Sequence, residues 1–211
     1  MQIKLFQVNP VCENTYLLYD ETKEAVIIDC GASNEIENRK IQSLIDTNSL
    51  KLKYLLNTHL HFDHALGNHF IYQTYGIKPQ YHAAEANMPS LAKQAAFFGI
   101  PITYEPVTAD RFLNDNEEIR LGNTVLKTIF TPGHSPGSLS YYCAEDACVF
   151  TGDALFRLDI GRTDLWGGDE NTLITAIKTR LLTLPPQTRI FPGHDGASTV
   201  ADEIAKNPYI R

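Results

Sequence analysis

The sequence predicts an α/β protein in which two β-rich layers lie between outer helices. Two observations carry this prediction: runs with the pattern of strands precede runs with the pattern of helices, and this order occurs twice. Because 43% of the 211 residues are hydrophobic, the chain has enough apolar residues to form one sizeable core. No stretch rich in Pro, Gly or Ser divides it, so we expect a single domain over residues 1–211.

The first half of the chain opens with alternating polar and apolar residues, a pattern typical of strands. The expected strands cover residues 3–8, 15–19, 25–29, 54–57 and 79–82. The expected helices cover residues 33–46, 66–75 and 83–98. In the first helix the apolar residues recur on one face, and Ser33 or Asn34 is the expected cap.

The second half repeats the order of strands followed by helices. The expected strands cover residues 117–121, 124–130, 138–143, 148–151 and 189–191. The turn pair Gly122-Asn123 predicts a hairpin between the first two of these strands. The expected helices cover residues 172–182 and 197–205. The two halves share no evident sequence identity, so the repeat is architectural.

Charge and targeting patterns narrow the classes of partner. The formal net charge is -7, and the basic residues form no longer run than a pair, which disfavours nucleic acid as a partner. The N-terminus alternates polar and apolar residues and lacks the apolar run of a signal peptide or a membrane span. We therefore expect a cytoplasmic enzyme with a small-molecule substrate and no membrane partner.

The cysteine pattern argues against a structural zinc ribbon, because the four cysteines form no Cys-x-x-Cys pair. Cys143 and Cys148 flank a short turn, and a hairpin there would place them opposite each other. A disulfide is then one alternative. Reduced thiols are the expectation for a cytoplasmic protein.

Three histidines and an aspartate fall within six consecutive positions. The segment His59-Leu60-His61-Phe62-Asp63-His64 follows a predicted strand and opens a predicted helix, where α/β proteins place their sites. In an extended loop, alternating His59, His61 and Asp63 face one side while His64 faces another. This pattern predicts two adjacent metal ions better than one.

Three further potential metal ligands each come directly after a glycine, just beyond the end of a predicted strand. They are His134 in Phe130-Thr131-Pro132-Gly133-His134, Asp153 in Phe150-Thr151-Gly152-Asp153, and His194 in Phe191-Pro192-Gly193-His194. Glycine permits a tight turn from which the next side chain projects. With the histidine cluster, these residues form a set of five histidines and two aspartates, a donor set that suits zinc, iron or manganese.

The motif resembles that of the metallo-β-lactamase-fold hydrolases, and the resemblance covers essentially the whole chain. It implies a four-layer αββα sandwich, with His59, His61 and His134 on one metal ion, Asp63, His64 and His194 on a second, and Asp153 bridging both. Asp29, in Asp29-Cys30-Gly31, matches an early turn of the family whose aspartate supports the ligands from behind. The implied cofactors are two divalent ions, with zinc expected first and iron or manganese as alternatives.

The segments around Asp153 and Gly161-Arg162-Thr163-Asp164 are similar to the short bacterial members of the glyoxalase II group. This resemblance implies hydrolysis of S-lactoylglutathione-type thioesters. The expected nucleophile is a metal-activated hydroxide, and Asp63 or the bridging site handles the proton. The chain stops soon after His194, so we expect no C-terminal helical glutathione-binding domain. In true β-lactamases of this fold a cysteine or no bridging ligand stands at the position of Asp153, which argues against antibiotic hydrolysis.

Alternatives remain for the reaction and for several side chains. Persulfide dioxygenases share the motif but use a single iron, which would bind His59, His134 and Asp153; lactone hydrolysis is a third reaction. Arg157 and Arg162 follow Asp153 and are candidates to attract a substrate carboxylate, although pairing with a nearby aspartate is favoured for Arg162. We expect structural roles for His69 and His82.

Overall fold

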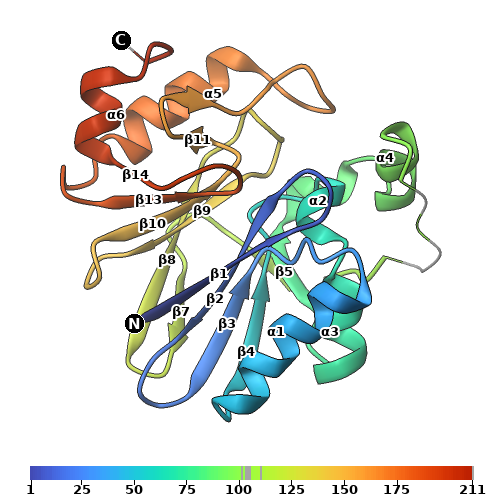
Figure 1. The fold of residues 1–211 in the computed structure, drawn as a ribbon. Helices are drawn as coiled ribbons and strands as arrows, with labels where there is room; N and C mark the ends of the chain where they lie inside the picture. Colours follow the sequence, from blue (N-terminus) through green and yellow to red (C-terminus); the bar gives the residue numbers. More distant parts are fainter. Residues whose placement is uncertain (101, 103–105, 110, 211) are drawn as a thin grey trace. The chain divides into compact units, whose positions relative to one another are not determined.

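The computed structural model describes residues 1–100, 102, 106–109 and 111–210 (Figure 1). The chain groups into two compact units. The first consists of Met1–Tyr81, Pro89–Phe112 and Arg120–Thr124, and the second of His82–Met88, Leu113–Ile119 and Val125–Arg211. The single domain expected from the sequence stays a prediction.

The first unit is built around a six-stranded sheet in which the strands follow one another in chain order. These strands are β1 (Gln2–Val8), β2 (Glu13–Tyr19), β3 (Glu24–Ile28), β4 (Lys51–Leu56), β5 (Pro79–His82) and β6 (Phe112–Leu113). Pairing is antiparallel from β1 to β3 and parallel from β3 to β5. Because parallel neighbours point the same way, β3 and β4 end at the same edge of the sheet.

Two helices cover the first sheet, α1 (Glu35–Thr47) and α3 (Asn68–Tyr75) (Figure 1). The side chain of Asn34 caps α1 by accepting a hydrogen bond from the backbone of Glu37, as the sequence predicts. Ile41, Ile45 and Ile71 from these helices pack into a core with apolar residues of β2, β3 and β4. Burial of these side chains supplies the main stabilisation of the unit.

A second six-stranded sheet forms most of the second unit, in the order β14-β13-β10-β9-β8-β7. Its strands are β7 (Glu118–Leu121), β8 (Thr124–Phe130), β9 (Leu139–Cys143), β10 (Cys148–Gly152), β13 (Arg189–Pro192) and β14 (Ser198–Thr199). β10 and β13 are parallel neighbours, with Gly152 opposite Pro192. The chain segments that follow these two strands therefore start side by side.

The helical elements of the second unit are α5 (Glu170–Ala176), η2 (Ile177–Leu181) and α6 (Val200–Lys206). Leu173, Ile177 and Val200 from these elements pack against Val149 and Ile190 of the sheet. A small hairpin of β11 (Leu155–Phe156) and β12 (Asp159–Ile160) stands beside them. None of the helices within the described residues has the length and apolar character that crossing a bilayer requires.

The predicted helix over 83–98 is wrong in one respect, because the structure divides it into η1 (Ala83–Asn87) and α4 (Leu91–Phe97). Met88, between them, is extended with ψ 156°. The following Pro89 disfavours a helical conformation at Met88 and has no N–H to donate, so the helix stops.

The helix expected over 66–75 begins two residues later than predicted, at Asn68, and ends at Tyr75 as predicted. The structure has α2 (Phe62–Ala65), then Gly67 as the cap of α3. The last helix begins at Val200 instead of residue 197, because Ser198 and Thr199 first pair with β13.

Candidate metal centre

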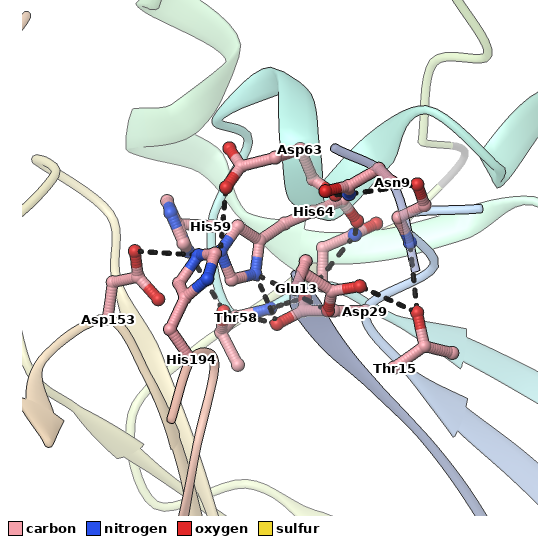
Figure 2. Close-up of polar contacts among 12 residues, drawn as sticks. Asn9, Glu13, Thr15, Asp29, Thr58, His59, Asp63, His64, Asp153 and His194 are labelled. Atoms are coloured by element: carbon pink, nitrogen blue, oxygen red, sulfur yellow. Dashed lines mark hydrogen bonds and ion pairs between the residues drawn. The ribbon is translucent and has the colours of Figure 1, made fainter. Parts of the chain in front are cut away.

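The first unit carries four of the seven predicted ligands after β4, with His59 and His61 before α2 and Asp63 and His64 within it. The side chains of His59, His61, Asp63 and His64 are all buried. The ring centroid of His59 lies 4.7 Å from that of His61 and 4.2 Å from that of His64. Figure 2 shows the rings of His59 and His64 beside the carboxylate of Asp63. Burying three imidazoles and a carboxylate together is costly unless charge compensates them, and a cation does so.

Asp29 holds this segment from the end of β3. One carboxylate oxygen accepts the backbone N–H of Thr58 at 2.7 Å, and the other accepts its hydroxyl at 2.8 Å. The second oxygen also lies 2.9 Å from Nδ1 of His64 (Figure 2). Asp29 is therefore the buried support that the family resemblance implies. Its backbone φ of 51° is left-handed, a conformation that aspartate tolerates better than most residues.

The bond to Asp29 orients the imidazole of His64. With Nδ1 directed at a carboxylate, Nε2 is the nitrogen that points to the other side, where it lies 3.7 Å from a carboxylate oxygen of Asp63. A nitrogen and an oxygen at this spacing are close enough to bind the same divalent cation. The geometry agrees with the predicted pairing of Asp63 and His64 on one metal ion.

Glu13 is a member of this network that the sequence did not reveal. It lies at the start of β2, is fully buried, and has a carboxylate oxygen 3.8 Å from Nδ1 of His64. Its other oxygen accepts the hydroxyl of Thr15 at 2.7 Å. Burial raises the pKa of the Glu13 carboxyl well above its ordinary value. No local pattern distinguished Glu13, because the polar residues Asn14 and Thr15 follow it.

The second unit carries the other three predicted ligands, each just beyond the end of a strand. His134 follows β8, Asp153 follows β10 and His194 follows β13. One carboxylate oxygen of Asp153 lies 3.6 Å from Nε2 of His134 and 3.7 Å from Nε2 of His194. A carboxylate that faces two imidazole nitrogens in this way fits the bridging role predicted for Asp153.

Backbone contacts fix these donors. Nδ1 of His134 lies 2.7 Å from the carbonyl oxygen of Arg162, so Nε2 is the nitrogen that faces Asp153. Gly161 packs against the same turn, and a Cβ at this glycine would lie 1.8 Å from the carbonyl oxygen of Asp153. No side chain fits at this position, which explains the glycine.

Glu85 is a second buried carboxylate that the sequence did not single out. It is 1% exposed and accepts the hydroxyl of Ser135 at 2.7 Å and the backbone N–H of Gly137 at 2.6 Å. Both donors follow His134 within three residues. Glu85 therefore anchors the segment after His134 to η1 across about fifty residues of sequence.

Arg162 and His82 make structural contacts, as the sequence predicts. Arg162 forms a two-pronged ion pair with Asp164, with N–O distances of 2.7 and 2.8 Å. The ring of His82 packs against that of Phe130, with centroids 4.6 Å apart and an interplanar angle of 33°. Its Nδ1 accepts the backbone N–H of Ala84.

The comparisons with known proteins bear on these two groups of donors. A family model described as the metallo-β-lactamase superfamily matches residues 9–194. The chain belongs to the metallo-β-lactamase superfamily. Its predicted fold class, α/β with the metallo-β-lactamase fold, is thereby confirmed.

The relatives of this chain are named for different activities. The chain is 37% identical to a probable metallo-hydrolase YqgX of Bacillus subtilis and 35% identical to hydroxyacylglutathione hydrolase GloC of Haemophilus influenzae, each over 100% of this chain and 98% of that protein. It is also 34% identical to the mitochondrial persulfide dioxygenase ETHE1 of Mus musculus, over 93% of this chain and 71% of that protein.

Solved structures of the superfamily resemble the chain over nearly its full length. The B3 metallo-β-lactamase BLEG-1 has a TM-score of 0.87 and 33% identity, covering 99% of both chains. TTHA1623 in a di-iron-bound form has a TM-score of 0.86 and 34% identity, covering 98% of this chain and 99% of that one. Together with the donor groups, these relatives indicate a metal-dependent hydrolase of the superfamily. The assignment of seven ligands and two ions stays a prediction.

Proposed function

We propose that this protein is a dinuclear thioesterase that hydrolyses S-lactoylglutathione-type thioesters. The observation that carries the proposal is the carboxylate of Asp153, which faces the Nε2 atoms of both His134 and His194. The relative GloC is named for hydrolysis of this substrate class, and the similar TTHA1623 holds two iron ions.

In this proposal, two groups of side chains hold the ions. One ion is assigned to His59, His61 and His134 and the other to Asp63, His64 and His194, with Asp153 shared. Five neutral imidazoles and two carboxylates fit zinc, iron or manganese, and zinc is the expected ion. When bound, such ions supply a water that loses its proton near neutral pH and positive charge for the departing thiolate.

The chain's own residues orient the donors and move the proton. Asp29 keeps the ring of His64 in one orientation, and the carbonyl oxygen of Arg162 does the same for His134. We assign to Asp63 the transfer of a proton from water to the leaving thiol. The reaction adds one water across the C–S bond and releases a carboxylic acid and a thiol. Four free thiols suit a reducing compartment, so we also propose a cytoplasmic location.

A second candidate function is persulfide dioxygenation, favoured by the similarity to ETHE1. That reaction would need one iron held by His59, His134 and Asp153. The substitution His64→Ala separates the two functions, because it removes a ligand that only the dinuclear centre uses.

The decisive experiment measures metal content and hydrolysis of S-lactoylglutathione in the purified protein. We expect two ions per chain in the wild type, and loss of metal and hydrolysis in His61→Ala and Asp153→Ala. His69→Ala, a histidine outside the proposed ligand set, serves as control. One iron per chain that survives His64→Ala, with oxygen uptake on glutathione persulfide, contradicts the thioesterase. Turnover of an acyl-homoserine lactone or a β-lactam in place of the thioester also contradicts it.

A further inference from the structure

The two arginines that follow Asp153 have different surroundings in the structure. Arg162 is engaged by both carboxylate oxygens of Asp164. Arg157 instead lines a surface pocket of about 380 Å³ in the second unit. A pocket of this volume is of the size that small ligands occupy. The candidate for attracting a substrate carboxylate is therefore Arg157.

The polar lining of this pocket is predominantly cationic. It consists of Arg157, Arg189, Lys206, Ser198, Thr199 and Asp202. The single acid of the lining, Asp202, binds Lys206 at 2.5 Å and Thr199 at 3.1 Å, and it also interacts electrostatically with Arg157. Three cations outnumber this acid and the buried carboxylate of Glu203 behind the walls, so the pocket has an excess of positive charge on a chain whose net charge is -7. Such a local reversal of sign attracts anions.

A fully buried carboxylate holds the walls of the pocket in place. Glu203 accepts the backbone N–H of Leu158 at 3.0 Å and the hydroxyl of Ser198, and it binds the side chain of Asn207 at 2.7 Å. These bonds join the turn of the β11–β12 hairpin and β14 to α6. The cationic side chains therefore project from a backbone that is fixed before any ligand binds.

The rim of the pocket includes a strained apolar residue. Arg157 and Leu158 form the two-residue turn between β11 and β12. Leu158 has a left-handed φ of 62° and is 39% exposed, at a turn position where Gly or Asn is preferred. A leucine in such a conformation points to a role for its side chain, here an apolar surface beside a cation.

The pocket also lies within reach of two proposed metal ligands of the same unit. The ring of Phe156, next to Arg157, is 6.2 Å from the ring of His194. Arg157 comes four positions after Asp153, so their Cα atoms lie at most about 14 Å apart. In a tripeptide thiol such as glutathione, each carboxylate lies one to two residue lengths from the sulfur, about 3–7 Å. The long, flexible side chain of Arg157 can cover the rest of this distance.

We propose that this pocket binds a carboxylate of the thiol half of the substrate, with Arg157 as the principal contact. The inference rests on the proposed thioesterase function and narrows it to thiols that carry a carboxylate one to two residue lengths from the sulfur. Arg189 and Lys206 add long-range attraction, and Leu158 packs against the aliphatic part of the ligand.

The test compares S-lactoylglutathione with its diethyl ester, in which both carboxylates are masked. The preference is the kcat/KM for S-lactoylglutathione divided by that for the diethyl ester. We expect Arg157→Gln to lower this ratio about tenfold. Arg157→Lys should lower it less, because the charge remains. The preference of the wild type should also weaken with added salt. Lys178→Gln removes the same charge from an exposed site outside the pocket and should leave the ratio unchanged.

An unchanged ratio in a folded Arg157→Gln protein overturns the inference. If the wild type hydrolyses neither thioester, the proposed function fails, and the pocket is then tested by calorimetric titration with S-methylglutathione. Binding to the wild type that weakens about tenfold in Arg157→Gln supports the pocket. Equal affinity in the two proteins, or no binding to the wild type, overturns it.

Discussion

Nδ1 of His64 lies 2.9 Å from a carboxylate oxygen of Asp29, and both side chains are buried. The same carboxylate also accepts two hydrogen bonds from Thr58, immediately before the first histidine of the motif. Asp29 thus ties the end of β3 to both ends of the histidine segment. The donors of the first unit are therefore in place because one buried carboxylate organises them.

Asp29→Asn tests this organisation. Asparagine keeps the size of the side chain and tolerates the left-handed φ, but it presents an N–H₂ group where acceptors are needed. We expect metal affinity to fall by about 10- to 100-fold, measured by competition with a chelator. Asp46→Asn, the same exchange at an exposed position on α1, should bind metal as the wild type does. Wild-type affinity in Asp29→Asn contradicts the proposed role.

Gly161→Ala tests the close approach of Gly161 to the backbone of Asp153. The added Cβ would lie 1.8 Å from the carbonyl oxygen of Asp153, so the turn must move. We expect a loss of about 3 kcal/mol in the free energy of unfolding, measured by urea denaturation, together with reduced metal content. Gly196→Ala is the matched control, since a Cβ there meets no atom within 4 Å. Equal stability of the two variants contradicts the prediction.

The ion pair of Asp115 with Arg180 predicts a pH-dependent contribution to stability. Burial by itself raises the pKa of Asp115, but hydrogen bonds from Arg180 and from the backbone of Phe130 outweigh it and lower this pKa below its ordinary value of 3.8. A depressed pKa stabilises the fold above the unfolded-state value, and this stabilisation disappears as the pH falls through the folded-state pKa.

We therefore expect Asp115→Asn to lower the free energy of unfolding by about 1 kcal/mol at pH 7, because the pair is partly exposed. Urea denaturation at pH 7 and near pH 3 measures the difference between variant and wild type. It should shrink toward zero in acid. A difference that stays constant or grows in acid has the wrong sign for this ion pair.

The burial of the cysteines predicts how many of them react with a thiol reagent. Cys12 is exposed, whereas Cys30, Cys143 and Cys148 are buried, and burial raises the pKa of the Cys30 thiol. We expect a thiol reagent to label one cysteine quickly in the folded protein and all four after unfolding in guanidinium. Cys143 and Cys148 lie directly opposite each other on β9 and β10, as the hairpin prediction implies. Only two reactive thiols in the unfolded, unreduced protein would instead indicate a disulfide between them.

Most strands and helices follow from local patterns, and the departures have local causes. Pro89 ends η1 and separates it from α4, an effect that the apolar pattern over 83–98 conceals. The two-residue strand β14 has no pattern of its own, because it exists only through pairing with β13. Short elements of this kind depend on a partner strand that lies elsewhere in the chain.

The sequence by itself determined which side chains are the candidate donors and where they follow strands, because short spacings and glycine turns are local properties of the chain. Only the tertiary structure decided which carboxylates support them. Glu13 and Glu85 have ordinary sequence surroundings and become significant through contacts with His64 and Ser135, 51 and 50 residues away. The tertiary structure also distinguished the two arginines: Arg162 pairs with Asp164, whereas Arg157 lines the cationic pocket. Burial and long-range hydrogen bonds select these residues, and both arise only when distant segments pack together.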